Sequence, residues 1–317
     1  MSKIDVIVEK ITEEATDIKS LRLVSRTGAA LPPFEAGAHI DVHVGGVARQ
    51  YSLCGDPADT SAYLIGVKLE AQSRGGSKAV HALKEGDCLQ ISEPRNLFAL
   101  DAGNGPALLI GAGIGITPLV AMMHQLKARN TAFTLHYFAR SSEHLAFSET
   151  LLRTDAELDF GRMHFHLGLD AQATGDQLDE LLARPEPGQH VYFCGPGPFM
   201  EAIRQRCKDW SKETVHFEYF SAEPVEVTDG GFEVIAARSG KRVWVGPDQS
   251  ITDALSAAGV EVCVSCEQGI CGTCLTRVLD GTPIHNDLFL NDAEKAKNDQ
   301  MLPCISRAST HTLTLDI

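Results

Sequence analysis

Four cysteines toward the end of the sequence constrain this chain more than any other feature. They are spaced C-x4-C-x2-C, with the fourth thirty residues later. They are Cys266, Cys271, Cys274 and Cys304. Thiolates are soft ligands, and this spacing is the one with which proteins hold a [2Fe–2S] cluster. Gly269 and Gly272 would let the loop curl around a cluster, because glycine reaches positive φ at little cost. The pattern predicts a [2Fe–2S] site.

Zinc is the competing interpretation. Cys263 and Cys266 form one CxxC pair, and Cys271 and Cys274 form another. Zinc ribbons separate such pairs by about 15–20 residues, whereas these lie much closer together. Zinc would also leave Cys304 without a role. We therefore expect iron and sulfide, with Cys263 as a buried thiol on the preceding strand.

Length, charge and cysteine use narrow the class of protein. A chain of 317 residues suggests about two or three domains. Its net charge of −14 argues against a nucleic-acid partner, because phosphate binding requires a basic surface. Nine cysteines, five beyond the proposed ligands, do not indicate a disulfide framework. A reducing cytoplasm suits free thiols and a thiolate cluster, so we expect a cytoplasmic protein.

Neither a signal segment nor a membrane span is expected. The first residues lack a basic stretch followed by an apolar one. Residues 106–123 are uncharged, but three glycines and Pro118 interrupt them, so we predict a buried strand, a turn and a helix start. The segment 226–317 carries 13 acidic and 7 basic residues. That surplus could steer a basic protein partner or simply keep the surface solvated.

Residues 1–102 are predicted to form a small antiparallel β-barrel, because short strand-like runs follow one another with few helical stretches. The runs cover 4–10, 19–25, 38–44, 47–53 and 63–69. Gly45-Gly46 is a hairpin signal between two of them.

Two motifs on this barrel could bind a ligand. The first is Arg49-Gln50-Tyr51-Ser52, in which Arg49 and Tyr51 share one strand face and Ser52 points to the other. The second is a loop with Gly75, Gly76 and Ser77 before a helical stretch near 79–83. Glycines, a hydroxyl and a helix N-terminus form a natural anion site. Taken alone, each motif is weak, because an arginine and an aromatic on a strand face are usually ordinary surface and packing, and such loops are commonly plain turns.

Residues 103–222 are predicted to form an α/β domain with a parallel sheet. An apolar run over 106–110 leads into a GxGxG turn that includes Gly113 and Gly115. A helix over 118–129 follows, with Thr117 as its predicted N-cap and Pro118 at its first position. This geometry suits a phosphate, and a structural tight turn is the alternative.

The alternation of strands and helices then continues. Strands are predicted over 133–138, 164–167, 190–193 and 215–217, and helices over 147–153, 175–184 and 197–208. Ligands of such sheets bind at the carboxyl ends of the strands. Three candidate sites lie there, namely 111–117, Arg140-Ser141 and 194–200.

The last part divides into a linker over 223–231 and a domain over 232–317. We predict strands at 232–237, 242–245, 275–279 and 311–316, and a helix over 250–258 that ends at Gly259. His285 is expected at the surface.

Together these motifs resemble the phthalate dioxygenase reductase family of the ferredoxin-reductase superfamily. The resemblance covers essentially the whole chain and rests on Arg-x-Tyr-Ser, the Gly-Gly-Ser loop, Pro94-Arg95-Asn96-Leu97-Phe98, Cys194-Gly195-Pro196 and the cysteine spacing. It implies a flavin barrel, a pyridine-nucleotide domain and a β-grasp domain like that of plant-type ferredoxins.

The resemblance also implies roles for particular residues. Arg49 and Ser77 would hold the phosphate of FMN, beside Gly75 and Gly76. Tyr51, Ser52 and the backbone at Val67-Lys68 would line its ring, and Phe220 would cover it, with Phe217 and Tyr219 as alternatives. Gly113, Gly115 and Thr117 would bind the pyrophosphate of NADH, and Cys194-Gly195-Pro196 would approach its nicotinamide. Arg140 would flank the adenine ribose or pair with the extra phosphate of NADPH.

The function implied is electron transfer from NADH through FMN and the [2Fe–2S] cluster to a separate Rieske-type oxygenase that acts on an aromatic compound. Flavin can take up two electrons together and release them singly. No side chain is expected to act as a general acid or base, and we expect a monomer. Two alternatives stay open: a reductase that serves another one-electron acceptor, and a redox sensor.

Overall fold

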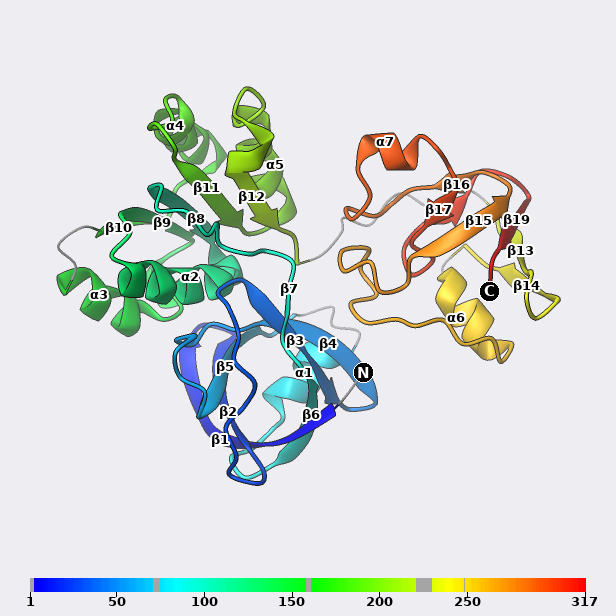
Figure 1. Ribbon diagram of the computed structural model, residues 1–317, viewed down its shortest axis with the longest axis horizontal. Coiled ribbons are helices and arrows are strands. Elements are labelled where there is room, and N and C mark those ends of the chain that lie inside the picture. The colour runs from blue at the N-terminus through cyan, green and yellow to red at the C-terminus, as the bar shows by residue number, and fades with distance from the viewer. Residues whose placement is uncertain (1–2, 71–74, 158–160, 221–229, 248) are drawn as a thin grey trace. The chain divides into compact units, whose positions relative to one another are not determined.

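The chain forms two compact units, residues 1–218 and 219–317, each of which is considered by itself. The structure is a computed structural model and describes residues 3–70, 75–157, 161–220, 230–247 and 249–317 (Figure 1). Most of the predicted linker, 223–229, lies outside the described residues.

The first unit begins with an antiparallel sheet, as predicted. Its strands are β1 (Lys3–Ala15), β2 (Ile18–Ser25), β3 (Ala38–Val44), β4 (Val47–Ser52), β5 (Ala62–Lys68), β6 (Cys88–Ser92) and β7 (Arg95–Asn96). They follow the order β4-β3-β6-β1-β2-β5, with β7 beside β3. A bridge between Leu53 and Ile65 joins the two ends, so the sheet closes on itself. Helix α1 (Gly76–His81) follows β5.

The second part of this unit is a five-stranded parallel sheet. Its strands are β8 (Ala107–Ala112), β9 (Phe133–Ala139), β10 (Gly161–Leu167), β11 (His190–Cys194) and β12 (Val215–Glu218). Their order is β10-β9-β8-β11-β12, so the direction of winding reverses between β8 and β11. Every residue of β8 is buried, as expected of a central parallel strand.

Helices cover both faces of the parallel sheet (Figure 1). They are α2 (Ile116–Arg129), α3 (Ser148–Ala156), α4 (Ala171–Leu182) and α5 (Gly197–Arg206). Three short 3-10 turns accompany them: η1 (Gly113–Gly115), η2 (Ser142–His144) and η3 (Lys212–Thr214).

The prediction for the start of α2 was wrong. The helix begins at Ile116, with Gly115 as its N-cap and no side-chain cap. Thr117 lies inside the first turn, and its hydroxyl donates a hydrogen bond to the Ile114 carbonyl at 3.0 Å. The glycine turn is itself helical, as the 3-10 segment η1, so the chain already has helical geometry before Pro118.

The second unit contains a mixed sheet in the order β14-β13-β19-β15-β17. Its elements are β13 (Phe232–Ala236), β14 (Lys241–Val245), α6 (Ile251–Ala257), β15 (Thr276–Asp280), β16 (Pro283–Ile284), α7 (Asp292–Lys295), β17 (Gln300–Met301), β18 (Arg307–Ala308) and β19 (Thr312–Leu315). Leu255 from α6 packs with Val234 and Leu313 in its core. Gly259, at φ +71°, follows α6 as predicted.

Two predictions in this unit were wrong. Cys263 is exposed and lies on no strand, because the chain runs in irregular structure from the end of α6 to the ligand loop. The His285 side chain is only 9% exposed, and its ring forms a hydrogen bond with Asn298 Oδ1 at 3.2 Å. It is held inside the loop-rich stretch that follows β16.

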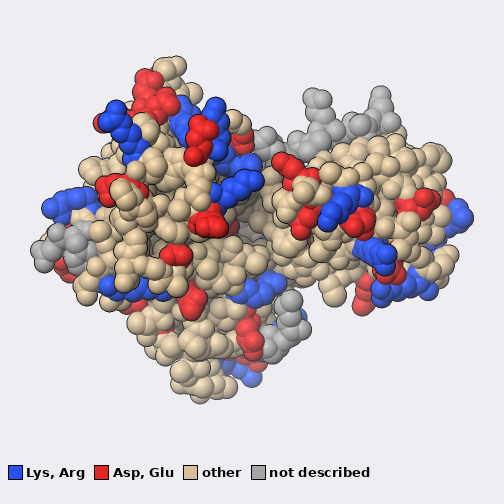
Figure 2. Space-filling model, turned by 45° about the horizontal axis from the view of Figure 1, so that its top comes forward, with Lys and Arg blue, Asp and Glu red and all other residues tan. Residues whose placement is uncertain are grey.

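Surface charge is mixed rather than segregated on the face drawn in Figure 2, where acidic and basic side chains alternate. Steering of a basic partner by an acidic surface stays a prediction. In the part of the chain that is described, no helix has the length and apolarity needed to cross a membrane.

Candidate functional site

The barrel and the parallel sheet meet along β5 and the start of α2. A Cβ atom added at Gly66 would lie 2.7 Å from the Thr117 methyl carbon, so the two elements touch at that glycine. The Ala36 amide also donates to the Gln125 side chain at 2.7 Å, and the Phe147 amide donates to Glu14 at 3.2 Å. These contacts place Thr117 next to the end of β5, where two of the predicted flavin contacts lie.

The predicted phosphate site comes together around Arg49. The stem of its side chain lies against Gly76, where an added Cβ would be 2.6 Å from Arg49 Cγ. Gly75 precedes α1 at φ +103°, which favours glycine. Ser77 is the second residue of α1, after Gly76. Its hydroxyl oxygen accepts a hydrogen bond from the Glu70 amide at 3.1 Å. A cation, a small-residue turn and a hydroxyl therefore adjoin, as an anion site requires.

The predicted contacts of the flavin ring lie on β4 and β5. Tyr51 is half-buried, and burial raises its pKa to about 12, so it is a neutral phenol. Ser52 and Val67 are buried, and the Val67 carbonyl is 2.9 Å from the Nε2 atom of His81. Lys68 pairs with Glu70 at 2.9 Å. The bridge that follows β4 holds these two strand ends beside each other.

The two predicted nucleotide turns form one edge of the parallel sheet. A Cβ added at Gly115 would lie 2.3 Å from the Cys194 carbonyl oxygen, so no side chain fits there. Gly113 has φ +55°, and its carbonyl accepts a hydrogen bond from the Tyr137 hydroxyl at 3.0 Å. This edge lies between β8 and β11, at the switch point where ligands of open α/β sheets bind.

The remaining nucleotide-site candidates lie nearby at strand ends. Cys194 is fully buried at the end of β11, Gly195 is half-buried, and Pro196 precedes α5 and is exposed. Arg140 is exposed at the end of β9. Phe220 is half-buried two residues after β12, and its assignment to the flavin ring stays a prediction.

Glu218 is a site residue that the sequence analysis missed. It ends β12 beside Cys194, and Ser52 of the barrel donates a hydrogen bond to its Oε2 atom at 3.4 Å. Burial raises the pKa of Glu218 to about 8, and the bond from Ser52 opposes that rise. Burial and the nearby Glu218 both raise the pKa of Cys194. The sequence did offer one signal for Glu218, because it is the single carboxylate between aromatic residues at the end of this strand.

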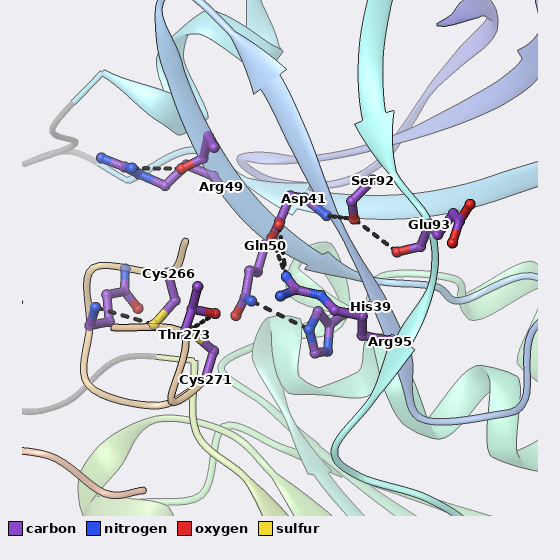
Figure 3. Close-up of polar contacts among 12 residues, drawn as sticks. His39, Asp41, Arg49, Gln50, Ser92, Glu93, Arg95, Cys266, Cys271 and Thr273 are labelled. Atoms are coloured by element: carbon purple, nitrogen blue, oxygen red, sulfur yellow. Dashed lines mark hydrogen bonds and ion pairs between the residues drawn. The ribbon is translucent and has the colours of Figure 1, made fainter. Parts of the chain in front are cut away.

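The four predicted cluster ligands come together in the second unit as two pairs. Cys266 and Cys271 are within hydrogen-bond contact, and so are Cys274 and Cys304. Contact with Cys266 lowers the pKa of the Cys271 thiol. Figure 3 shows this loop, in which the Cys271 thiol donates to the Thr273 hydroxyl and the Gln268 amide donates to Cys266.

This arrangement fits a two-iron cluster better than zinc. Three of the cysteines are buried and Cys271 is half-buried. Gly269 and Gly272 have φ near +72° and +71°, which confirms the predicted curl of the loop. Among the described residues, no three Cys, His, Asp or Glu side chains surround one point as the ligands of a single ion would. Two pairs of thiolates match two irons with two protein ligands each.

Comparison with known proteins agrees with the description of the parallel sheet and with that of the cysteine loop. Residues 109–205 match the oxidoreductase NAD-binding domain family, and residues 234–309 match the 2Fe-2S iron–sulfur cluster binding domain family. The vanillate O-demethylase oxidoreductase of Pseudomonas sp. (strain HR199 / DSM 7063) is 50% identical, over 99% of this chain and all of its own length. The phthalate dioxygenase reductase of Burkholderia cepacia is 38% identical, over 96% of this chain and 94% of its own length.

A solved structure gives the same result. It is described as phthalate dioxygenase reductase, a modular structure for electron transfer from pyridine nucleotides to [2Fe-2S]. It matches with a TM-score of 0.82 and 37% identity, over 100% of this chain and 98% of that one.

The fold and site thus define a flavin and iron–sulfur oxidoreductase that uses a nicotinamide nucleotide. The chain belongs to the phthalate dioxygenase reductase and vanillate O-demethylase oxidoreductase family. It is the reductase component of a Rieske-type oxygenase system and passes electrons through a flavin to the [2Fe–2S] cluster.

Proposed function

We propose that the flavin is FMN, that the electron donor is NADH, and that the acceptor is a separate Rieske-type oxygenase that acts on an aromatic compound. The observation that carries the choice of FMN is the contact between Arg49 and the Gly75-Gly76-Ser77 turn. A guanidinium beside backbone amides and a hydroxyl suits a terminal phosphate, which FMN exposes.

The residues of the first unit would bind and orient the two reactants. Tyr51, Ser52 and the backbone at Val67-Lys68 would hold the ring, and the turn at Gly113 and Gly115 would receive the pyrophosphate. Because the Cys194 side chain is buried, its backbone and Gly195 would contact the nicotinamide. When bound, the flavin supplies the conversion between two-electron and one-electron transfer.

The four cysteines would hold the cluster, and the half-buried Cys271 would lie at its most accessible edge. The relatives include reductases named for vanillate and phthalate, which supports an aromatic substrate for the partner oxygenase. We further propose a cytoplasmic monomer with functional domains at 1–102, 103–222 and 232–317, joined by a linker at 223–231. Both matched domain families fall inside these limits.

Two measurements test the cofactors. Flavin released by denaturing the purified protein should run as FMN in chromatography, and FAD would contradict the proposed phosphate site. Turnover of ferricyanide should be much faster with NADH than with NADPH. Faster turnover with NADPH would assign Arg140 to the 2′-phosphate of NADPH instead, and equal rates would contradict a preference for NADH.

A variant tests the phosphate site directly. We expect Arg49→Ala to weaken FMN binding about tenfold or more, because a charge-assisted contact is lost. Arg26→Ala is the matched control, since Arg26 is a largely exposed arginine of the same barrel. Fluorescence titration of the flavin-free protein gives both affinities, and equal affinities would contradict the site.

A further inference from the structure

Tyr137 joins the glycine turn to the segment before α3. It belongs to β9, and its side chain is fully buried. Its hydroxyl donates a hydrogen bond to the Gly113 carbonyl at 3.0 Å and accepts one from the Ala146 amide at 3.2 Å. Burial raises the pKa of Tyr137, so the phenol keeps its proton. Because the Ala146 amide can only donate, the phenolic hydrogen is directed at Gly113.

This hydrogen bond orients one peptide group of the turn. Gly113 has φ +55°, and an added Cβ there would meet nothing within 4 Å, so packing does not hold this glycine. A glycine can change its backbone angles at little cost. The Gly113 carbonyl is held by Tyr137 from outside the turn and by the Ile116 amide from within it. In a trans peptide the N–H points opposite to the C=O, so the Ile114 amide is turned away from Tyr137.

The orientation of this peptide group decides which atom an anion would meet. The turn leads into α2 at the switch point between β8 and β11, where the pyrophosphate is proposed to bind. Backbone N–H groups at the start of a helix attract phosphate oxygens. If the peptide turned over, the Gly113 carbonyl oxygen would replace the Ile114 amide on the side away from Tyr137, and an oxygen repels an anion.

The other partner of Tyr137 is held by the barrel. Phe147, which follows Ala146, is buried and has φ +58°, a left-handed conformation that a bulky residue rarely adopts. Its amide donates to Glu14 Oε2 at 3.2 Å, and Ser20 Oγ donates to the other oxygen of that carboxylate at 2.6 Å. An added Cβ at Gly66 of β5 would lie 3.0 Å from the Phe147 ring. These contacts hold the strained residue, and with it the Ala146 amide, against the barrel.

We propose that Tyr137 is a positioning residue for the nucleotide, because its hydroxyl turns the Gly113 peptide so that the Ile114 amide faces the pyrophosphate. Glu14 and Phe147 tie this arrangement to the barrel, whose strand β5 carries two of the proposed flavin contacts. Tyr137 acts through the turn and takes no part in hydride transfer. This inference rests on the proposed function, since there the turn receives the pyrophosphate of NADH.

The first test removes a single oxygen atom. Tyr137→Phe keeps the ring and deletes the hydroxyl. We expect the KM for NADH in ferricyanide turnover to rise about tenfold, as one lost hydrogen bond would give, and kcat to stay within about twofold. Tyr63→Phe is the matched control, because Tyr63 is fully buried in the barrel and its hydroxyl donates to the Pro32 carbonyl. The control should keep the wild-type KM, and an unchanged KM in Tyr137→Phe would overturn the inference.

ADP-ribose gives a readout without turnover, because it contains the pyrophosphate but no nicotinamide. In calorimetric titration of the holoprotein, its affinity should be about tenfold lower in Tyr137→Phe and unchanged in Tyr63→Phe. Equal affinities for the wild type and Tyr137→Phe would overturn the role of the hydroxyl. If the wild type itself does not bind ADP-ribose, the proposed nucleotide site is wrong.

The tie to the barrel is tested through Glu14. Glu14→Ala removes the acceptor of the Phe147 amide and should lower the ADP-ribose affinity about threefold, because it acts one contact further from the turn. Combined with Tyr137→Phe, the two losses should be smaller than their product, since both break one line of contacts. Glu13→Ala is the matched control, because Glu13 is exposed and pairs with Lys19. If Tyr137→Phe does not fold, a wild-type affinity in Glu14→Ala would overturn the proposal.

Discussion

The four proposed cluster ligands differ sharply from the other cysteines near them. Cys304 is buried against Cys274, whereas Cys263 is exposed outside the ligand loop. We expect Cys304→Ser to abolish the [2Fe–2S] spectrum and leave NADH-to-flavin reduction intact, because the proposed flavin contacts on β4, β5 and α1 lie in the other unit. Cys263→Ser should keep the full cluster spectrum. A full [2Fe–2S] spectrum in Cys304→Ser would show that the ligand assignment is wrong.

Glu218 makes stability depend on pH in a direction opposite to that of most carboxylates. Its folded pKa of about 8 lies above the ordinary value of 4.5, so the folded state binds the proton more tightly than the unfolded state. The free energy of unfolding that Glu218 adds is complete below the ordinary pKa and is lost as the pH rises through the folded pKa. Between these two pKa values, each pH unit lowers the free energy of unfolding by about 1.4 kcal/mol.

Glu218→Gln should remove this dependence, because the amide does not titrate. We expect the thermal unfolding midpoint of the first unit to fall between about pH 5 and pH 8 in the wild type and to fall less in the variant. Parallel curves for the two proteins would mean that Glu218 is ionised throughout.

At the scale of elements, the close approach of the glycine turn to β11 is the contact that builds the nucleotide edge. Gly115→Ala would place a methyl group against the Cys194 carbonyl. We expect a loss of about 1–3 kcal/mol in stability from overpacking, with a raised KM for NADH. Gly246→Ala is the control, since an added Cβ there meets nothing within 4 Å. An unchanged KM in Gly115→Ala would contradict the assignment of this edge.

Local patterns predicted the elements well. Predicted strands such as 38–44 and 133–138 coincide with β3 and β9 to within one residue. The start of α2 was missed because η1 gives the glycine turn helical geometry ahead of Pro118. Elements follow from periodicity and turn residues that lie close together in the sequence.

Contacts between distant residues could not be predicted in the same way. Ser52 and Glu218 are 166 positions apart, and their contact arises only when the barrel packs on the parallel sheet. The cysteine ligands were identifiable because their own spacing carries the chemistry.

For the whole molecule, the two units divide the predicted cofactor sites between them. The first unit joins a barrel to a nucleotide-binding sheet, and the second unit holds the paired cysteines. Membership of the reductase family covers nearly the whole chain, so the three parts act within one polypeptide. Two-electron chemistry would be confined to the first unit, and the second unit would carry one electron at a time.

The central claim is that electrons from NADH reach the cluster through the flavin. An anaerobic titration of the purified protein with NADH, followed by visible absorbance and by electron paramagnetic resonance, tests it most directly. We expect bleaching of both flavin and iron–sulfur bands, with the signal of a reduced [2Fe–2S] cluster. Bleaching of the flavin alone in protein that holds a full cluster would contradict this electron path.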